Sequence, residues 1–216
     1  MIGAMPATPS LPAKALALYS AALIGLLALS GWRPFDLVTW AMEVVPVVVV
    51  LALLWATRQR FPLTPLLYAL IFVHACVLML GGHYSYARVP LGDWLRDALR
   101  LARNPYDGIG HFMQGFVPAV AARELLLRHT GLQRGGWLFV VVTGVCLGIS
   151  ALYELIEWGA ALALGQGADE FLGTQGDPWD TQKDMALALI GAMAAQWLLA
   201  RRHDRQLAAL GRGGRS

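Results

Sequence analysis

Residues 171–184, FLGTQGDPWDTQKD, form a polar, acidic and turn-rich segment between two long apolar runs. Asp177, Asp180 and Asp184 follow one another at intervals of three and four residues, so a helix here carries all three on one face. Pro178 favours an extended or turn conformation before it and a helix start directly after it. The segment therefore predicts a helix that begins near Asp180 with carboxylates at its start. On these residues alone, a helix-capping loop explains the acidic groups as well as a functional site does.

The apolar runs on either side belong to a strongly hydrophobic chain. Of its 216 residues, 57% are hydrophobic and 14% are charged, and the mean hydropathy is +0.53. A soluble domain usually carries about a quarter charged residues. Because the apolar residues come in long blocks, the sequence predicts an all-α, polytopic membrane helix bundle. Cys76 and Cys146 lie within apolar segments, which indicates buried small side chains rather than a disulfide framework.

The chain is expected to form a single integral-membrane domain over residues 1–216 with about six transmembrane helices. The spans are expected near residues 13–31, 37–56, 65–80, 110–128, 137–164 and 184–200. Residues 91–103 predict an amphipathic helix at the membrane interface, because Trp94 falls on its apolar face. A small lid packed on the bundle is the alternative for this helix. The Gly- and Arg-rich composition of residues 203–216 predicts a disordered tail.

Lys and Arg residues predict the orientation of the bundle. With six spans both termini share one side, and most of the Lys and Arg residues outside the spans lie on that side. The positive-inside rule then places both termini in the cytoplasm. The four Arg residues between positions 88 and 103 argue weakly against this, and pairing with Asp93 and Asp97 reduces the objection. The net charge of +3 indicates membrane topology and lipid headgroups rather than nucleic acid.

This topology brings ionisable side chains from five of the six spans to one depth, at the face opposite the termini. Isolated charges in lipid cost at least about 2.5–3.5 kcal/mol each on insertion scales, so these groups should face inward and find partners. The polar cluster expected at this face contains Glu43, His83, Asp107, His111, Gln114, Glu154, Glu157, Asp177, Asp180 and Asp184.

Two spacings within this cluster favour a metal site. Asp107 and His111 are four residues apart and Glu154 and Glu157 are three apart, so each pair shares one helical face. A neutral imidazole with several carboxylates can bind a divalent cation, and the oxygen-rich set favours Mg, Mn, Ca or Fe over a thiolate-type zinc site; zinc with His and carboxylate ligands is the alternative. The expected metal ligands are His111, Glu154, Glu157 and Asp180, and the expected catalytic residues, acting as a base or supporting the ligands, are Asp107 and Asp184.

Each of these residues also has a purely structural interpretation. Glu154 and Glu157 can pair with Arg or with backbone groups inside the bundle. Asp107 can be the N-cap of its helix, and His111 can be an ordinary hydrogen-bonded helix residue. The sequence contains no Gly-x-Ser-x-Gly motif, no phosphate-binding Gly loop with a following Lys, and no Cys-x-x-Cys motif.

Several stretches of the sequence resemble a known family. They are WAME at residues 40–43, His74, GHYSYARVP at 82–90, NPYDGIGHFMQGF at 104–116, SALYELIEW at 150–158 and the segment 171–184. The chain resembles the YjdF family of bacterial inner-membrane proteins, a domain of unknown function, from about residue 37 to residue 200. The resemblance implies a multi-pass protein of the bacterial inner membrane and carries no established reaction. A looser similarity in spacing links Asp107, His111 and the later acidic pairs to VanZ-like membrane proteins.

Three functions remain open from the sequence. The first is a metal-dependent membrane enzyme that acts at the outer face on an envelope or lipid-linked substrate. The second is a transporter or an ion- or proton-relay protein that uses the carboxylates. The third is a non-catalytic membrane protein in which the acidic cluster is structural. An open coordination position on a bound metal would favour the enzyme.

Overall fold

The computed structural model describes residues 11–164 and 175–213 and shows an all-α bundle, as the sequence predicts. Its elements are α1 (Ala13–Ser30), α2 (Leu37–Thr57), α3 (Pro65–Tyr84), the 3-10 turn η1 (Tyr86–Arg88), α4 (Pro90–Leu99), α5 (Tyr106–His129), α6 (Gly136–Leu164) and α8 (Asp180–Gly213). The part of the segment 171–184 before Gln175 lies outside the described residues.

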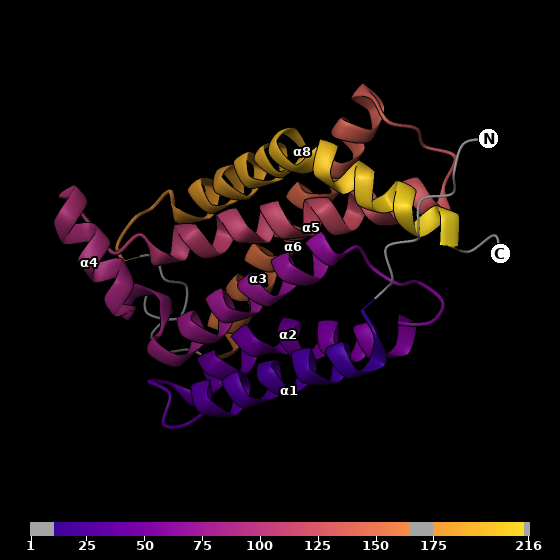
Figure 1. Ribbon diagram of the computed structural model, residues 1–216. Coiled ribbons are helices and arrows are strands. Elements are labelled where there is room, and N and C mark those ends of the chain that lie inside the picture. Colours follow the sequence, from indigo (N-terminus) through magenta and orange to yellow (C-terminus); the bar gives the residue numbers. More distant parts are fainter. Residues whose placement is uncertain (1–10, 165–174, 214–216) are drawn as a thin grey trace.

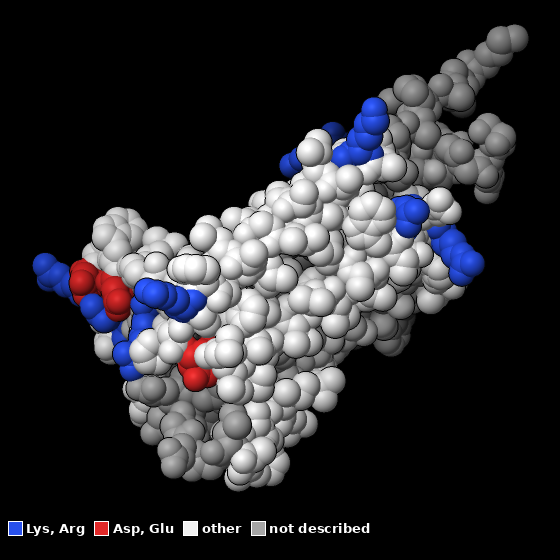
Figure 2. Space-filling model, turned by 90° about the horizontal axis from the view of Figure 1, so that it is seen from below, with Lys and Arg blue, Asp and Glu red and all other residues white. Residues whose placement is uncertain are grey.

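The long helices run side by side, so the bundle has two ends (Figure 1). One end carries α4, the start of α5 and the start of α8, and is called the α4 end below. The other carries the start of α1 and the end of α8, and is called the terminal end. On the face that Figure 2 shows, Lys and Arg gather toward the two ends and a broad uncharged band lies between them. That pattern is typical of a protein embedded in a bilayer.

Among the described residues, five helices are long and apolar enough to cross a membrane: α1, α2, α3, α6 and α8. α5 is the exception, because it carries the buried polar residues Asp107, His111, Arg123 and Glu124. It can hold them because it packs against α3, α6 and α8, so these side chains face protein rather than lipid. The membrane helix bundle is thus built around a helix that carries several buried polar side chains.

Two glycines bring α5 and α8 close together. A Cβ atom added at Gly115 would overlap the backbone of Ala188, and one added at Gly191 would overlap the backbone oxygen of Phe112. Small residues at such crossings let two membrane helices pack backbone against backbone. This contact fixes the position of the start of α8, and therefore of Asp184, relative to α5.

Two segments differ from the sequence-based expectation. α8 continues to Gly213, where the sequence predicted a span ending near 200 and a disordered tail from 203. The helix continues because His203 and Leu207 are buried and Asp204 pairs with Arg123 on α5. The interfacial helix ends at Leu99, four residues before the predicted end, because Arg100 adopts a left-handed conformation at φ 55°. Its Trp94 is 64% exposed, which favours the interfacial position over a packed lid.

Candidate functional site

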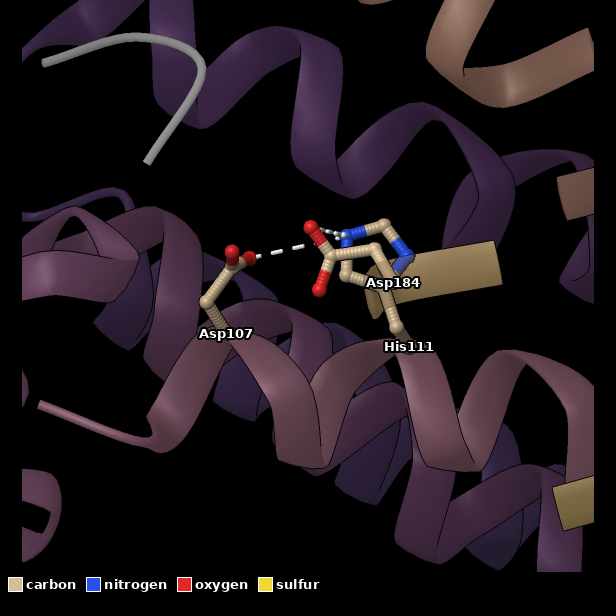
Figure 3. Close-up of side chains that lie close together, drawn as sticks. All are labelled: Asp107, His111 and Asp184. Atoms are coloured by element: carbon tan, nitrogen blue, oxygen red, sulfur yellow. Dashed lines mark ion pairs between the residues drawn. The ribbon is translucent and has the colours of Figure 1, made fainter. Parts of the chain in front are cut away.

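The candidate site lies at the α4 end and centres on His111 of α5. Its Nε2 atom lies 3.6 Å from Asp107 Oδ1, one turn earlier on the same helix, and 3.9 Å from Asp184 Oδ2 on α8. Its Nδ1 atom lies 3.3 Å from Gln114 Oε1 and 3.7 Å from Glu154 Oε1 on α6. Figure 3 shows Asp107, His111 and Asp184 gathered at one point between α5 and α8. The Nε2 atom of the ring therefore faces Asp107 and Asp184, and the Nδ1 atom faces Gln114 and Glu154.

Three carboxylate oxygens at this site are buried without a hydrogen-bond partner among the described residues. They are Asp107 Oδ2, Asp184 Oδ1 and Glu154 Oε1. The three residues are at most 9% exposed. A buried polar atom with no partner costs about 1–3 kcal/mol, and more when it is charged. The centre is therefore suited to hold a cation or protons between its oxygens.

Two overlapping groups have the arrangement that a metal ion requires. They are Asp107 with His111 and Asp184, and His111 with Glu154 and Glu157; within each group the possible ligand atoms lie within 4.8 Å of one another. Metal–ligand distances of about 2.0–2.2 Å would place neighbouring ligand atoms roughly 3–3.5 Å apart. The observed separations of 3.6 and 3.9 Å from His111 Nε2 need only a small side-chain movement to reach this range.

Asp180 and Asp177 have cationic partners of their own. Asp180 is buried and pairs with Arg103, which lies in the connection between α4 and α5. Asp177 pairs with Lys183, and its carboxylate lies 3.8 Å from Arg103. The Lys183 ammonium, followed by the backbone N–H of Trp179, lowers the pKa of Asp177. The two residues lie beside the centre but outside both possible metal groups.

Glu43 and His83 also lie outside these groups. Glu43 is buried on α2, and its Oε2 atom accepts hydrogen bonds from the hydroxyls of Tyr86 at 3.0 Å and Tyr153 at 3.1 Å. Burial, followed by the charge of Glu43, raises the pKa of Tyr86 well above its usual value, so this hydroxyl keeps its proton and donates. His83 Nδ1 lies 2.8 Å from the carbonyl oxygen of Ser30, at the junction of α1 and α3.

A cavity of about 360 Å³ adjoins the centre. Residues from α1, α2, α3, α5 and α6 line it, and its polar wall consists of Glu43, Tyr86, Asp107, His111, Gln114, Tyr153 and Glu157. Tyr86, Tyr153 and Arg103 are not among the site residues that the sequence predicts. The position of Tyr153, four residues before Glu157 and so on the same helical face, is the signal that could have identified it.

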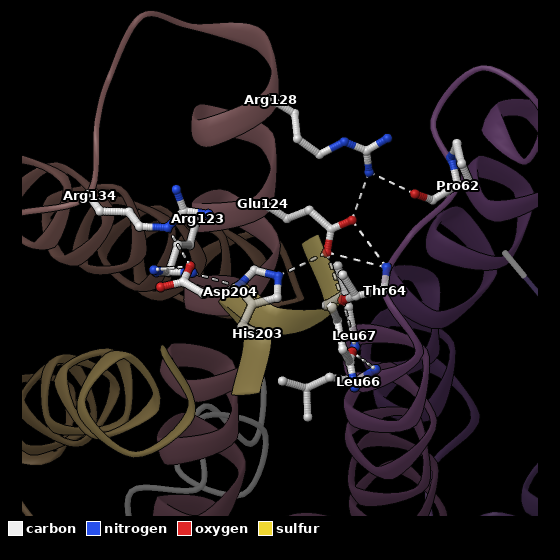
Figure 4. Close-up of polar contacts among 11 residues, drawn as sticks. Pro62, Thr64, Leu66, Leu67, Arg123, Glu124, Arg128, Arg134, His203 and Asp204 are labelled. Atoms are coloured by element: carbon white, nitrogen blue, oxygen red, sulfur yellow. Dashed lines mark hydrogen bonds and ion pairs between the residues drawn. The ribbon is translucent and has the colours of Figure 1, made fainter. Parts of the chain in front are cut away.

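A second buried network, at the terminal end, has the opposite character. Glu124 accepts hydrogen bonds from Thr64 and Arg128, and its Oε2 atom lies 3.0 Å from His203 Nε2 (Figure 4). Arg123 donates to Nδ1 of His203 at 2.9 Å. Because a guanidinium cannot accept, Nδ1 is the accepting nitrogen and Nε2–H donates to Glu124. The side chains of Glu124 and His203 therefore have hydrogen-bond partners for their polar atoms. We interpret this network as a structural clamp that holds α5 to α8 and to the start of α3.

The fold and the centre together define a class: a polytopic membrane protein with a buried carboxylate and histidine centre near one end of its bundle. The chain belongs to the family described as "Predicted membrane protein (DUF2238)", which matches residues 15–205. It is 56% identical over 186 residues to the "Inner membrane protein YjdF" of Escherichia coli, which covers 86% of this chain and 89% of that protein. The resemblance to the YjdF family is therefore confirmed.

No solved structure matches the chain. The looser similarity to VanZ-like proteins finds no support in these comparisons.

Proposed function

We propose that the chain is a metal-dependent enzyme of the bacterial inner membrane that acts on an envelope or lipid-linked substrate. The observation that carries this proposal is the set of buried carboxylate oxygens without hydrogen-bond partners around His111. A divalent cation would satisfy these oxygens and would neutralise several acidic groups held close together. The adjoining cavity supplies the space for a substrate beside the centre.

The geometry supports one ligand set best: His111 through Nε2, together with Asp107 and Asp184. A metal-binding histidine usually donates its other ring N–H to a carboxylate or a carbonyl oxygen, which fixes the orientation of the ring. Glu154 and Gln114 lie beside Nδ1 and would take this part. This set differs from the sequence-based assignment, which chose Asp180, because Asp180 already pairs with Arg103.

Glu157 is the group best placed to move a proton. It lines the cavity beside His111 and is only partly buried, whereas Glu154 faces the ring of His111. A cation held by these residues would supply Lewis acidity and would lower the pKa of a water molecule. Glu157 would then exchange a proton with a group held in the cavity, and Glu43 would orient the hydroxyls of Tyr86 and Tyr153 there.

The proposed orientation places this centre at the periplasmic face. The start of α1 and the end of α8 lie at the terminal end, and Arg58, Arg60, Arg128, Arg201 and Arg202 stand in or next to the helix portions at that end. The positive-inside rule then assigns the terminal end to the cytoplasm.

Elemental analysis of the detergent-purified protein tests the proposal. The wild type, incubated with divalent cations and then desalted, should retain about one cation per chain, and His111→Ala and Asp184→Asn should lose it. Asp97→Asn is the matched control, because its carboxylate lies on α4 and its side chain is 72% exposed. A wild type that retains no cation, with both variants folded, would contradict the metal site.

A proton or ion relay is the second candidate, supported by the same unpartnered oxygens. A relay also requires polar groups that continue toward the terminal end. The cavity wall in that direction contains Leu51, Ile71, Val117 and Ala121, with His74 as the polar exception. The apolar wall favours the enzyme. A cation-free protein that shows proton uptake in liposomes, abolished by Asp184→Asn, would favour the relay.

A further inference from the structure

The cavity beside the centre is polar at one wall and apolar elsewhere. Away from His111 and Glu43, its walls are formed by Val47 and Leu51 of α2, Ile71 of α3, and Val117. Its volume of about 360 Å³ falls within the range of roughly 300–1,000 Å³ that is usual for ligand sites. A water molecule beside these apolar side chains would find few hydrogen-bond partners. The apolar part is therefore suited to a hydrocarbon occupant.

The polar wall places donors and acceptors at one end of this space. Tyr86 from η1 and Tyr153 from α6 both point their hydroxyls at Glu43, and Asp107 and His111 border the same end. An occupant with a polar group at one end and an apolar chain at the other matches this distribution. The distribution of polar and apolar side chains around the cavity thus matches that of an amphiphilic molecule.

The packing of the helices indicates how such a molecule enters. α2 packs on α3, whereas α6 packs on α5 and α8, yet both α2 and α6 line the cavity. Ile149 of α6 lines the cavity and is also 41% exposed, which favours this side of the bundle as the point of entry. The neighbouring outward residues Val48, Leu152 and Ile156 are exposed and apolar, as expected of a surface in contact with lipid.

We propose that the cavity binds the apolar chain of a bilayer lipid, which enters sideways from the membrane between α2 and α6 and places its polar head at Glu43, Tyr86 and Tyr153. The inference deepens the proposed function, because it names a membrane lipid as the substrate class of the same site. The chain-binding part of the cavity does not itself include the cation centre.

Photo-cross-linking in nanodiscs tests this inference. The protein is reconstituted with phosphatidylglycerol that carries a diazirine on one acyl chain, irradiated, digested and mapped by mass spectrometry. The expected result is label on Val117 and Ala121, which line the cavity on α5. Val117 is 3% exposed, so lipid outside the bundle does not reach it.

Two substitutions fill the cavity from different walls. Ala121→Trp and Ile71→Trp should each reduce the cavity label by at least about fivefold, because the added ring occupies the space of the chain. Leu152→Trp is the control, because Leu152 is 58% exposed on the outer surface of α6 and the cavity label should persist. If one filled variant does not fold, the wild-type map and the other variant still decide the outcome.

Label restricted to outward residues such as Leu152, with none in the cavity, would overturn the lipid inference. Together with the elemental analysis this separates the two proposals. A bound cation with an unlabelled cavity removes the lipid inference alone, and a labelled cavity in a cation-free protein removes the metal proposal alone.

Discussion

Two buried imidazole rings in this bundle have opposite surroundings. His203 lies between Arg123 and Glu124, and both of its nitrogens have hydrogen-bond partners at 2.9 and 3.0 Å. His111 faces Asp107 and Asp184 at 3.6 and 3.9 Å, and one oxygen of each carboxylate lacks a partner among the described residues. Since a native structure satisfies most of its buried polar groups, the unsatisfied ring environment is the one that points to a ligand.

The partnered network predicts a large stability effect at Glu124. The Glu124→Ala variant leaves Arg128 without its carboxylate and removes the acceptor of His203 and Thr64. Breaking a buried ion pair on one side costs about 3–5 kcal/mol, so the free energy of unfolding should fall by about that amount. Chemical unfolding in detergent micelles, with the exposed Asp97→Ala as control, measures the difference. An unchanged unfolding midpoint would show that the network is not a clamp.

The residues of the centre could be predicted from the sequence more readily than their pairings. Hydropathy fixes the depth of Asp107, His111 and Glu154 within their helices, and burial of charge requires them to face inward. It does not say which side chain meets which. Arg103 lies in the connection between α4 and α5, where apolar residues do not recur at helical spacing. Its pairing with Asp180 depends on how the chain folds in three dimensions, so residue spacing could not predict it.

At the scale of elements, α5 and α8 form the central pair, because glycines allow their backbones to approach. Gly191→Ala should destabilise the bundle by about 1–3 kcal/mol, since the new methyl group overlaps the backbone oxygen of Phe112. It should also displace Asp184 and weaken cation binding. Gly144→Ala on α6 is the matched control, because open space surrounds that position. This control should be neutral or slightly stabilising, as alanine favours a helix.

Thermal unfolding and cation titration of both glycine variants measure these effects. Equal behaviour of Gly191→Ala and Gly144→Ala would contradict the importance of the close contact.

The apolar runs predicted the positions of the helices well, and they predicted the ends of the helices less accurately. α2 and α6 lie within about one residue of the expected 37–56 and 137–164, because long apolar blocks leave little choice. The end of α8 was missed, because the polar run from Arg201 to Arg205 suggests an exit from the membrane and a loss of structure. Burial of His203 and Leu207 against the rest of the bundle keeps this polar run helical, and that burial is a tertiary effect.

At the scale of the whole molecule, charges separate to the two ends of an uncharged band, which gives the orientation a direct test. In a background with Cys76 and Cys146 replaced by Ala, single cysteines are placed at Asp97 and Arg202, both exposed. A membrane-impermeant maleimide added to intact cells with a permeabilised outer membrane should label the cysteine at Asp97 and should label the one at Arg202 only after lysis. The reverse pattern would place the centre in the cytoplasm.

The length of α8 has a mechanical consequence. Its 34 residues make a rod roughly 50 Å long, whereas the hydrocarbon core of a bilayer is about 30 Å thick. The rod is therefore longer than the lipid core is thick, and its terminal portion carries Asp204, which pairs with Arg123 and Arg134. Its opposite tip carries Asp184. A molecule that binds this terminal portion therefore contacts the same continuous helix that carries Asp184 at the α4 end.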